Sequence, residues 1–342
     1  MEEIPSSPLQ AVRKSMSMIY NSEWKSLSQL KMDGGGVSKA VAVVACAAMA
    51  LFYVAILYAP TLILRLPPPP SFKNFMIRRF ICAAISSVVS VVVSALLLPM
   101  KSREASSLLG VYGIRMDHIW QAVIFPLTLT ALMYGGSLVL KSLLLMSALR
   151  EHMNFGGGLS FNNIKNLSEE IVACSRSIAS DVLVWRTYVV APLTEELVFR
   201  ACMLPLLLCG GFQKSTVIFL CPIFFSLAHL NHLKDVYSKQ NYNLTKAVLA
   251  IGLQLGYTVV FGSYASFLFI QTGHFLAPLV AHAFCNFMGL PVLVSRGKGI
   301  VSVASVAGIV GFLWLLFPMT HPELYNDRTD NCVCWQGYCS GN

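Results

Sequence analysis

Six long stretches without a charged residue most constrain what this chain can fold into. A helix needs roughly 20 apolar residues to cross the hydrocarbon core of a bilayer. Each stretch is at least that long, and together they occupy residues 40–64, 80–100, 119–140, 247–272, 275–295 and 300–320. The composition agrees, because 56% of the residues are hydrophobic and only 12% are charged, whereas soluble domains carry about 25% charged residues. We therefore predict an all-α, polytopic membrane protein and exclude a soluble enzyme, a secreted disulfide scaffold and a disordered chain.

Two less regular apolar stretches raise the predicted number of transmembrane helices to about eight. Residues 185–208 are apolar but contain four charged side chains, and residues 216–228 form a short apolar run that ends against His229. The long connector at residues 141–181, with three glycines at 156–158, is predicted to be an interfacial segment between two halves.

Three regions follow from this pattern. Residues 1–36 are Ser-rich, mixed in charge and end in three glycines, so they are predicted to be a disordered extension. Residues 37–320 form the membrane-embedded domain, and residues 321–342 form a polar tail that contains Cys332, Cys334 and Cys339. The formal net charge of +9 is typical of basic cytoplasmic loops in a membrane protein, so no nucleic-acid partner is expected.

The four charges within residues 185–208 point to a functional site inside the membrane. Each charge near the centre of a spanning helix costs about 2.5–3.5 kcal/mol on insertion scales, so the set costs on the order of 10 kcal/mol. These side chains must therefore face a protein interior or a water-filled cavity. A purely structural ion pair would need one acid, but the stretch supplies two adjacent ones, Glu195 and Glu196.

Helical spacing assigns different roles to the two acids. Glu196 and Arg200 are four residues apart and share one helix face, whereas Glu195 is turned by about 100° from Glu196. We expect Glu196 to pair with Arg200 and to support the site. Glu195 is then left as the candidate general base.

Two further pairs of residues at helical spacing contribute polar side chains. Phe225 and His229 are four residues apart, and so are His282 and Asn286. His229 ends its apolar run and is expected to lie beside Glu195, where a carboxylate and an imidazole together hold and deprotonate a water molecule. His282 and Asn286 share one face of an otherwise uncharged stretch and offer the two donors that an oxyanion needs.

These motifs, EExxxR at Glu195, Glu196 and Arg200, FxxxH at Phe225 and His229, and HxxxN at His282 and Asn286, occur in this order and resemble the type II CAAX prenyl endopeptidase family. The resemblance covers the membrane region. It implies an eight-helix, glutamate-type protease of the endoplasmic reticulum membrane that removes the three residues after a prenylated cysteine.

By the same resemblance, Glu195 is the base, His229 shares the water, and His282 with Asn286 forms the oxyanion hole. Glu196, Arg200 and Phe225 support the site. The expected partners are farnesylated or geranylgeranylated CAAX proteins, such as small GTPases, and membrane lipid. No cofactor and no metal ion are expected.

Two alternatives remain open at this point. Glu195, His229 and His282 could instead ligate a zinc ion that activates the water. The buried charges could also belong to a membrane transporter or scaffold that binds an ion or a partner and has no enzymatic activity.

Overall fold

The computed structural model describes residues 37–99, 105–154, 177–232, 237–238, 243–292 and 299–325, and these residues form helices and connections without a β-strand. The predicted all-α architecture is confirmed for this part of the chain. The predicted extension at residues 1–36, the glycines at 156–158, and the tail cysteines Cys332, Cys334 and Cys339 lie outside the described residues.

Four helical segments in the described part of the chain are long and apolar enough to cross a membrane. They are Lys39–Leu62, which begins with helix α2 (Lys39–Ala55), α4 (Phe72–Leu97), α14 (Leu244–Thr272) and α16 (Gly299–Met319). A fifth span is present if α6 (Ile119–Met133) and α7 (Gly135–Asn154), which meet at an angle of 80°, are counted together. The expected count of about eight spans is therefore not confirmed.

The remaining predicted spans differ from simple transmembrane helices for local reasons. Residues 216–228 lie in α12 (Lys214–Ala228), and residues 275–295 supply α15 (Leu276–Met288), whose 15 and 13 residues are too few to cross the hydrocarbon core. Residues 182–209 are helical throughout but carry the four charges. The first residues of the predicted interfacial connector at 141–181 continue α7 to Asn154, and residues 155–176 of it lie outside the described residues.

Polar side chains and glycine set the ends of the long helices. Ser38 caps α2 by accepting a hydrogen bond from the backbone N–H of Val41, and Ser71 caps α4 in the same way. Asn243 caps α14 at its start, and Gly273, with φ at 60°, ends it in the left-handed conformation that glycine adopts without strain. The cap at Ser71 starts α4 eight residues before the uncharged stretch and so brings Arg79 into the helix.

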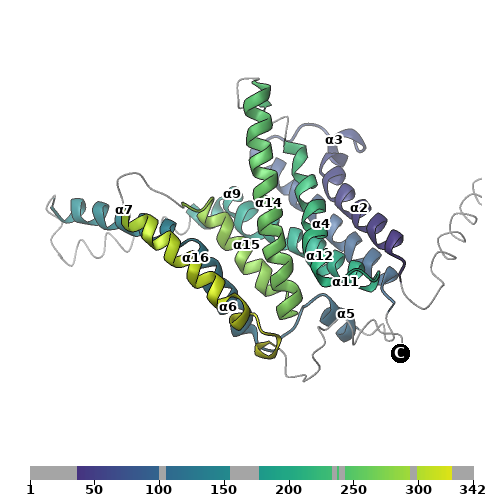
Figure 1. Cartoon of the computed structure of the whole chain (residues 1–342). Coiled ribbons are helices and arrows are strands. Elements are labelled where there is room, and N and C mark those ends of the chain that lie inside the picture. Colours follow the sequence, from purple (N-terminus) through teal and green to yellow (C-terminus); the bar gives the residue numbers. More distant parts are fainter. Residues whose placement is uncertain are drawn as a thin grey trace, which may run out of the picture.

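The helices pack around a buried helical run at residues 198–207. Figure 1 shows α14 upright through the middle, with α6, α7 and α16 on one side and α2, α4, α11 (Met203–Cys209) and α12 on the other. Helix α12 packs on α14, and α16 packs on α6 and α7. Every residue from 198 to 207 is buried, which is the pattern of a helix enclosed by protein on all sides. Arg200 lies within this run, and Glu196, which is also fully buried, lies just before it, so both charges are enclosed by the protein core.

Glycines allow the bent pair α6–α7 to pack closely on α16. A Cβ atom at Gly135 would lie 2.8 Å from the carbonyl oxygen of Ala304, and one at Gly136 would overlap the hydroxyl of Ser305. Gly308 on α16 approaches the carbonyl of Leu132 in the same way. Helices in membranes use such small residues to bring their backbones together.

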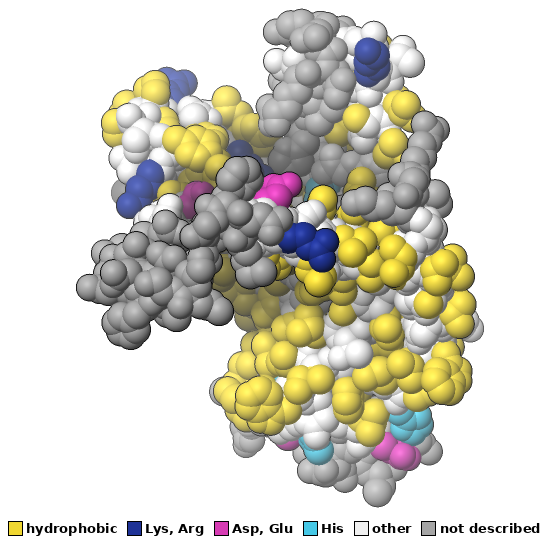
Figure 2. All heavy atoms as spheres, turned by 90° about the vertical axis from the view of Figure 1, so that its left-hand side faces the viewer, with side chains coloured by type: hydrophobic (Ala, Val, Ile, Leu, Met, Phe, Trp, Pro, Cys, Tyr) yellow, Lys and Arg dark blue, Asp and Glu magenta, His cyan; other side chains and the backbone are white. Residues whose placement is uncertain are grey.

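The outer surface is apolar where lipid is expected. Figure 2 shows hydrophobic side chains in a broad band across one face, with charged side chains above and below it. Helix α16 contributes exposed Val303, Val310 and Trp314, of which Trp314 is 78% exposed. Large exposed apolar areas of this kind are stable in lipid and rare on soluble monomers.

Candidate active site

The site is built on the helical run from Val182 to Cys209, which contains two π-helical turns. It consists of α9 (Val182–Trp185), a π-helical turn (Arg186–Val190), α10 (Ala191–Glu196), a second π-helical turn (Leu197–Cys202) and α11 (Met203–Cys209). Pro192 and Pro205 each follow a π-helical turn by two or three residues. Proline has no backbone N–H and so cannot form the hydrogen bond of a regular α-helix at its position. This favours a π-helical turn in the preceding residues.

Glu196 and Arg200 form a completely buried ion pair. Nη1 of Arg200 donates to Oε1 of Glu196 at 2.9 Å, and both side chains are 0% exposed. The other face of the guanidinium lies over the ring of Phe225, with its Cζ 4.5 Å from the ring centroid. The expected pair is thus present, and Phe225 contacts it directly.

Helix α14 closes around the same arginine. Nη2 of Arg200 lies 3.5 Å from the carbonyl oxygen of Gly262. A Cβ atom at Gly262 would stand 2.8 Å from Cβ of Pro222 and 3.2 Å from Nη2 of Arg200. Glycine is therefore required at this position to bring α14 close to the ion pair.

His282 on α15 lies between the two glutamates. Its Nδ1 is 2.7 Å from Oε1 of Glu196, and its Nε2 is 3.7 Å from Oε2 of Glu195. A carboxylate that already accepts from Arg200 is best satisfied by a second donor, so we assign the proton on Nδ1 to the contact with Glu196. Glu195 therefore does have a neighbour, which the helical spacing alone did not show.

Asn286 lies one turn further along α15 and makes a different contact. Its Nδ2 donates to the carbonyl oxygen of Thr187 at 2.8 Å. Thr187 belongs to the first π-helical turn, so this bond ties α15 to that turn. The side chains of His282 and Asn286 thus both reach the run at 182–209, at two separate points.

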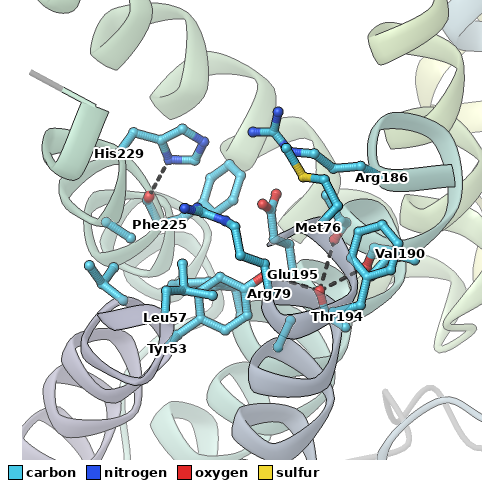
Figure 3. A pocket seen from close by; sticks show the side chains of 16 residues that line it. Tyr53, Leu57, Met76, Arg79, Arg186, Val190, Thr194, Glu195, Phe225 and His229 are labelled. Atoms are coloured by element: carbon cyan, nitrogen blue, oxygen red, sulfur yellow. Dashed lines mark hydrogen bonds between the residues drawn. The ribbon is translucent and has the colours of Figure 1, made fainter. Parts of the chain in front are cut away.

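Glu195 faces a pocket, together with His229. Its side chain is 17% exposed, in contrast to the buried Glu196. Figure 3 shows the carboxylate of Glu195 and the imidazole of His229 directed into the same space, which is also lined by Phe225. Nδ1 of His229 lies 2.9 Å from the carbonyl oxygen of Phe225. Because a carbonyl only accepts, Nδ1 carries the proton and Nε2 is the nitrogen presented to the pocket.

The pocket also contains residues to which the sequence assigned no role. Arg79 from α4 and Arg186 from the first π-helical turn both line it. Tyr53 of α2 is hydrogen-bonded to Thr194, at 2.9 Å between the two oxygens, and so fastens α2 next to Glu195. The signal for Arg186 was present, since it is one of the four charges in an apolar stretch. Arg79 directly precedes the uncharged stretch at residues 80–100, so the sequence pattern placed it outside the predicted span.

The zinc alternative gains no support from the geometry. Among the described residues, no three His, Cys, Asp or Glu side chains are grouped so that they could hold a metal ion.

Comparison with known proteins identifies the family. A family model described as type II CAAX prenyl endopeptidase, Rce1-like, matches residues 179–288. The chain is 60% identical over 310 residues to a CAAX prenyl protease 2 of Arabidopsis thaliana, which covers 91% of this chain and 99% of the relative. The chain belongs to the type II CAAX prenyl endopeptidase family. A human CAAX prenyl protease 2 is 33% identical over 301 residues, with 85% of each chain covered.

The residues matched by the family model contain the whole candidate site apart from the walls supplied by α2 and α4. EExxxR, FxxxH and HxxxN all fall between residues 179 and 288. Tyr53 and Arg79 lie outside the matched residues but within the pocket. No solved structure matches this member of the family at a significant level.

Proposed function

We propose that this protein is an intramembrane endopeptidase that removes the last three residues from prenylated CAAX proteins by means of a water molecule activated by Glu195 and His229. The observation that carries the proposal is the shared pocket of these two side chains in a chain of the CAAX prenyl endopeptidase family. The names of the relatives, CAAX prenyl protease 2, support the same substrate class.

In the proposed reaction, a water molecule lies between Glu195 and Nε2 of His229. Glu195 takes a proton from the water, and the resulting hydroxide attacks the carbonyl carbon of the prenylated cysteine. The proton then passes to the amide nitrogen as the C–N bond breaks, which leaves a carboxylate on the prenylcysteine and an amine on the tripeptide. General base catalysis of this kind contributes about 10²–10⁴-fold to a rate.

His282 and Asn286 are proposed to stabilise the oxyanion of the tetrahedral intermediate. In this role His282 donates to Glu196 through Nδ1 and to the oxyanion through Nε2. The Asn286 amide carries two N–H groups, so its bond to Thr187 leaves one N–H for the intermediate. A single oxyanion donor is worth about 10²–10³-fold in kcat.

The buried ion pair of Glu196 and Arg200 is proposed to orient His282. Glu196 holds Nδ1 of His282, and Arg200 holds Glu196. The pair thereby fixes the direction in which Nε2 of His282 points, which is the role that an orienting carboxylate has beside a catalytic histidine.

The membrane location suits a lipidated substrate. A prenyl chain gains about 0.8 kcal/mol for each CH₂ group buried in the bilayer, so the substrate is held at the membrane with its peptide at the interface. We further propose the endoplasmic reticulum membrane as the location and farnesylated and geranylgeranylated proteins, such as small GTPases, as substrates. Co-fractionation of the protein with markers of that membrane tests the location.

The purified protein, in detergent or in bilayer discs, tests the activity. It is expected to release a tripeptide from a farnesylated CAAX peptide, detected by mass spectrometry, and to spare the same peptide without farnesyl. Glu195→Gln should lower kcat by at least about 10²-fold. Glu151→Gln, at an exposed position of α7, is the matched control and should retain wild-type activity. Tripeptide release at the wild-type rate by Glu195→Gln would refute the role of Glu195.

A further inference from the structure

Two arginines face the catalytic pocket from different helices. Arg79 is part of α4, and Arg186 opens the first π-helical turn. Figure 3 shows both side chains extended into the space that also holds the carboxylate of Glu195 and the imidazole of His229. Both arginines are partly buried. The guanidinium of Arg79 also lies over the ring of Phe75, with 5.7 Å between Cζ and the ring centroid, which holds the side chain in place.

The described lining of the pocket carries more basic than acidic side chains. Among the described residues that line it, Glu195 is the one acidic side chain, against the two arginines. A lining with this balance of charge suits a ligand that brings an anionic group to the pocket.

The irregular helix turns Arg186 toward Glu195. The two residues are nine positions apart, and in a regular α-helix nine residues make 2.5 turns, which would put their side chains about 180° apart. The π-helical turn at Arg186–Val190 has more residues in each turn and therefore rotates less per residue. As a result, Arg186 and Glu195 line one pocket.

We infer that Arg79 and Arg186 bind the C-terminal carboxylate of the substrate, an inference that rests on the proposed function. A CAAX chain ends three residues after the prenylated cysteine, so the leaving fragment carries a carboxylate at a fixed position. Three extended residues span at most about 11 Å, so this carboxylate arrives in the same pocket as the scissile bond. Guanidinium groups match a carboxylate with paired N–H donors.

Arg79 and Arg186 together form what we call the carboxylate clamp. The clamp makes the free C-terminus of the substrate a determinant of specificity. A peptide whose carboxylate is replaced by a carboxamide loses the charge, and one extended by a residue carries the charge too far from the arginines. The enzyme would thereby select the ends of chains and spare prenylated cysteines followed by a longer sequence.

A comparison of two farnesylated peptides tests the clamp. They have the same CAAX sequence and end in a carboxylate or in a carboxamide. The wild-type protein is expected to cleave the acid with a kcat/KM about 10- to 100-fold higher, as for a hydrogen-bonded charge. The variants Arg79→Gln and Arg186→Gln should cleave the acid peptide more slowly, and their kcat/KM for the carboxamide peptide should change little. The ratio of the two kcat/KM values should therefore fall toward one. Arg186→Lys keeps the charge and should retain part of the preference.

Arg78→Gln is the matched control. Arg78 neighbours Arg79 on α4 but donates to the carbonyl oxygen of Pro67 at 2.8 Å and does not line the pocket. This variant should keep the wild-type ratio of acid to carboxamide cleavage. Thermal unfolding of each variant shows whether it is folded.

The outcomes separate this inference from the proposed function. Equal cleavage of both peptides by the wild-type protein overturns the clamp and leaves the protease function intact. If the arginine variants lose activity on both peptides to the same extent, the arginines act on something other than the carboxylate, such as a lipid phosphate, and the clamp is again overturned. No cleavage of the farnesylated acid by folded wild-type protein refutes the proposed function itself.

Discussion

Replacing Glu196 by glutamine should destabilise the protein far more than the same change at Glu195. The exchange keeps the shape of the side chain but removes the counter-charge of Arg200, which is 0% exposed. Removing one partner of a buried ion pair costs about 3–5 kcal/mol. At about 2 °C per kcal/mol for a chain of this size, the melting temperature should fall by about 6–10 °C.

Buried thiols give a direct assay for this prediction. Five cysteines in the described residues are free and buried, namely Cys46, Cys82, Cys202, Cys221 and Cys285. A thiol-reactive dye therefore reports unfolding of the purified protein as the temperature rises. Glu195→Gln, at a partly exposed position, is the control and should melt close to the wild type while losing activity.

A double variant isolates the cause. If the loss at Glu196→Gln comes from the uncompensated charge of Arg200, then adding Arg200→Met should recover part of the stability, because the two effects are coupled. Equal melting temperatures for Glu196→Gln and Glu195→Gln would show that water screens the pair and would refute the reasoning. A double variant less stable than Glu196→Gln would also contradict it.

Three further predictions concern catalysis, packing and metal dependence. His229→Ala should lower kcat on a farnesylated peptide by about 10²-fold or more while membrane insertion is kept, and activity close to the wild type would remove His229 from the mechanism. Gly262→Ala should destabilise the protein, because its Cβ would press on Pro222 and Arg200, whereas Gly256→Ala on the same helix has nothing within 4 Å and should be tolerated; a thermal melt of each compares them. Prolonged treatment with a zinc chelator should leave activity unchanged, and a loss restored by added zinc would favour the zinc alternative.

The sequence predicted local relations well and tertiary partners poorly. The ion pair between Glu196 and Arg200 followed from a separation of four residues on one helix. The contact of His282 with Glu196 did not, because it depends on how α15 packs against a helix 86 residues earlier in the chain. For the same reason, the sequence grouped Asn286 with His282 but could not show its bond to Thr187.

The count of about eight spans is not confirmed at the places where apolar composition and helix geometry differ. Residues 119–140 are uncharged throughout, but the helix bends by 80° at the glycines that let it approach α16. Hydropathy does not register a bend. It also placed Arg79 outside a span, because the cap at Ser71 extends α4 beyond the apolar stretch.

The first π-helical turn acts like a single inserted residue in an otherwise regular helix. Deleting one residue between Thr187 and Val190 would let the backbone return to the ordinary i→i−4 pattern of hydrogen bonds. The wide turn absorbs the extra residue, so the helix before it and the helix after it keep about the same relative orientation when that residue is removed. A deletion at this turn should therefore leave Arg186 and Glu195 directed to the same pocket, whereas deleting a residue from the regular α10 would turn them apart by about 100°.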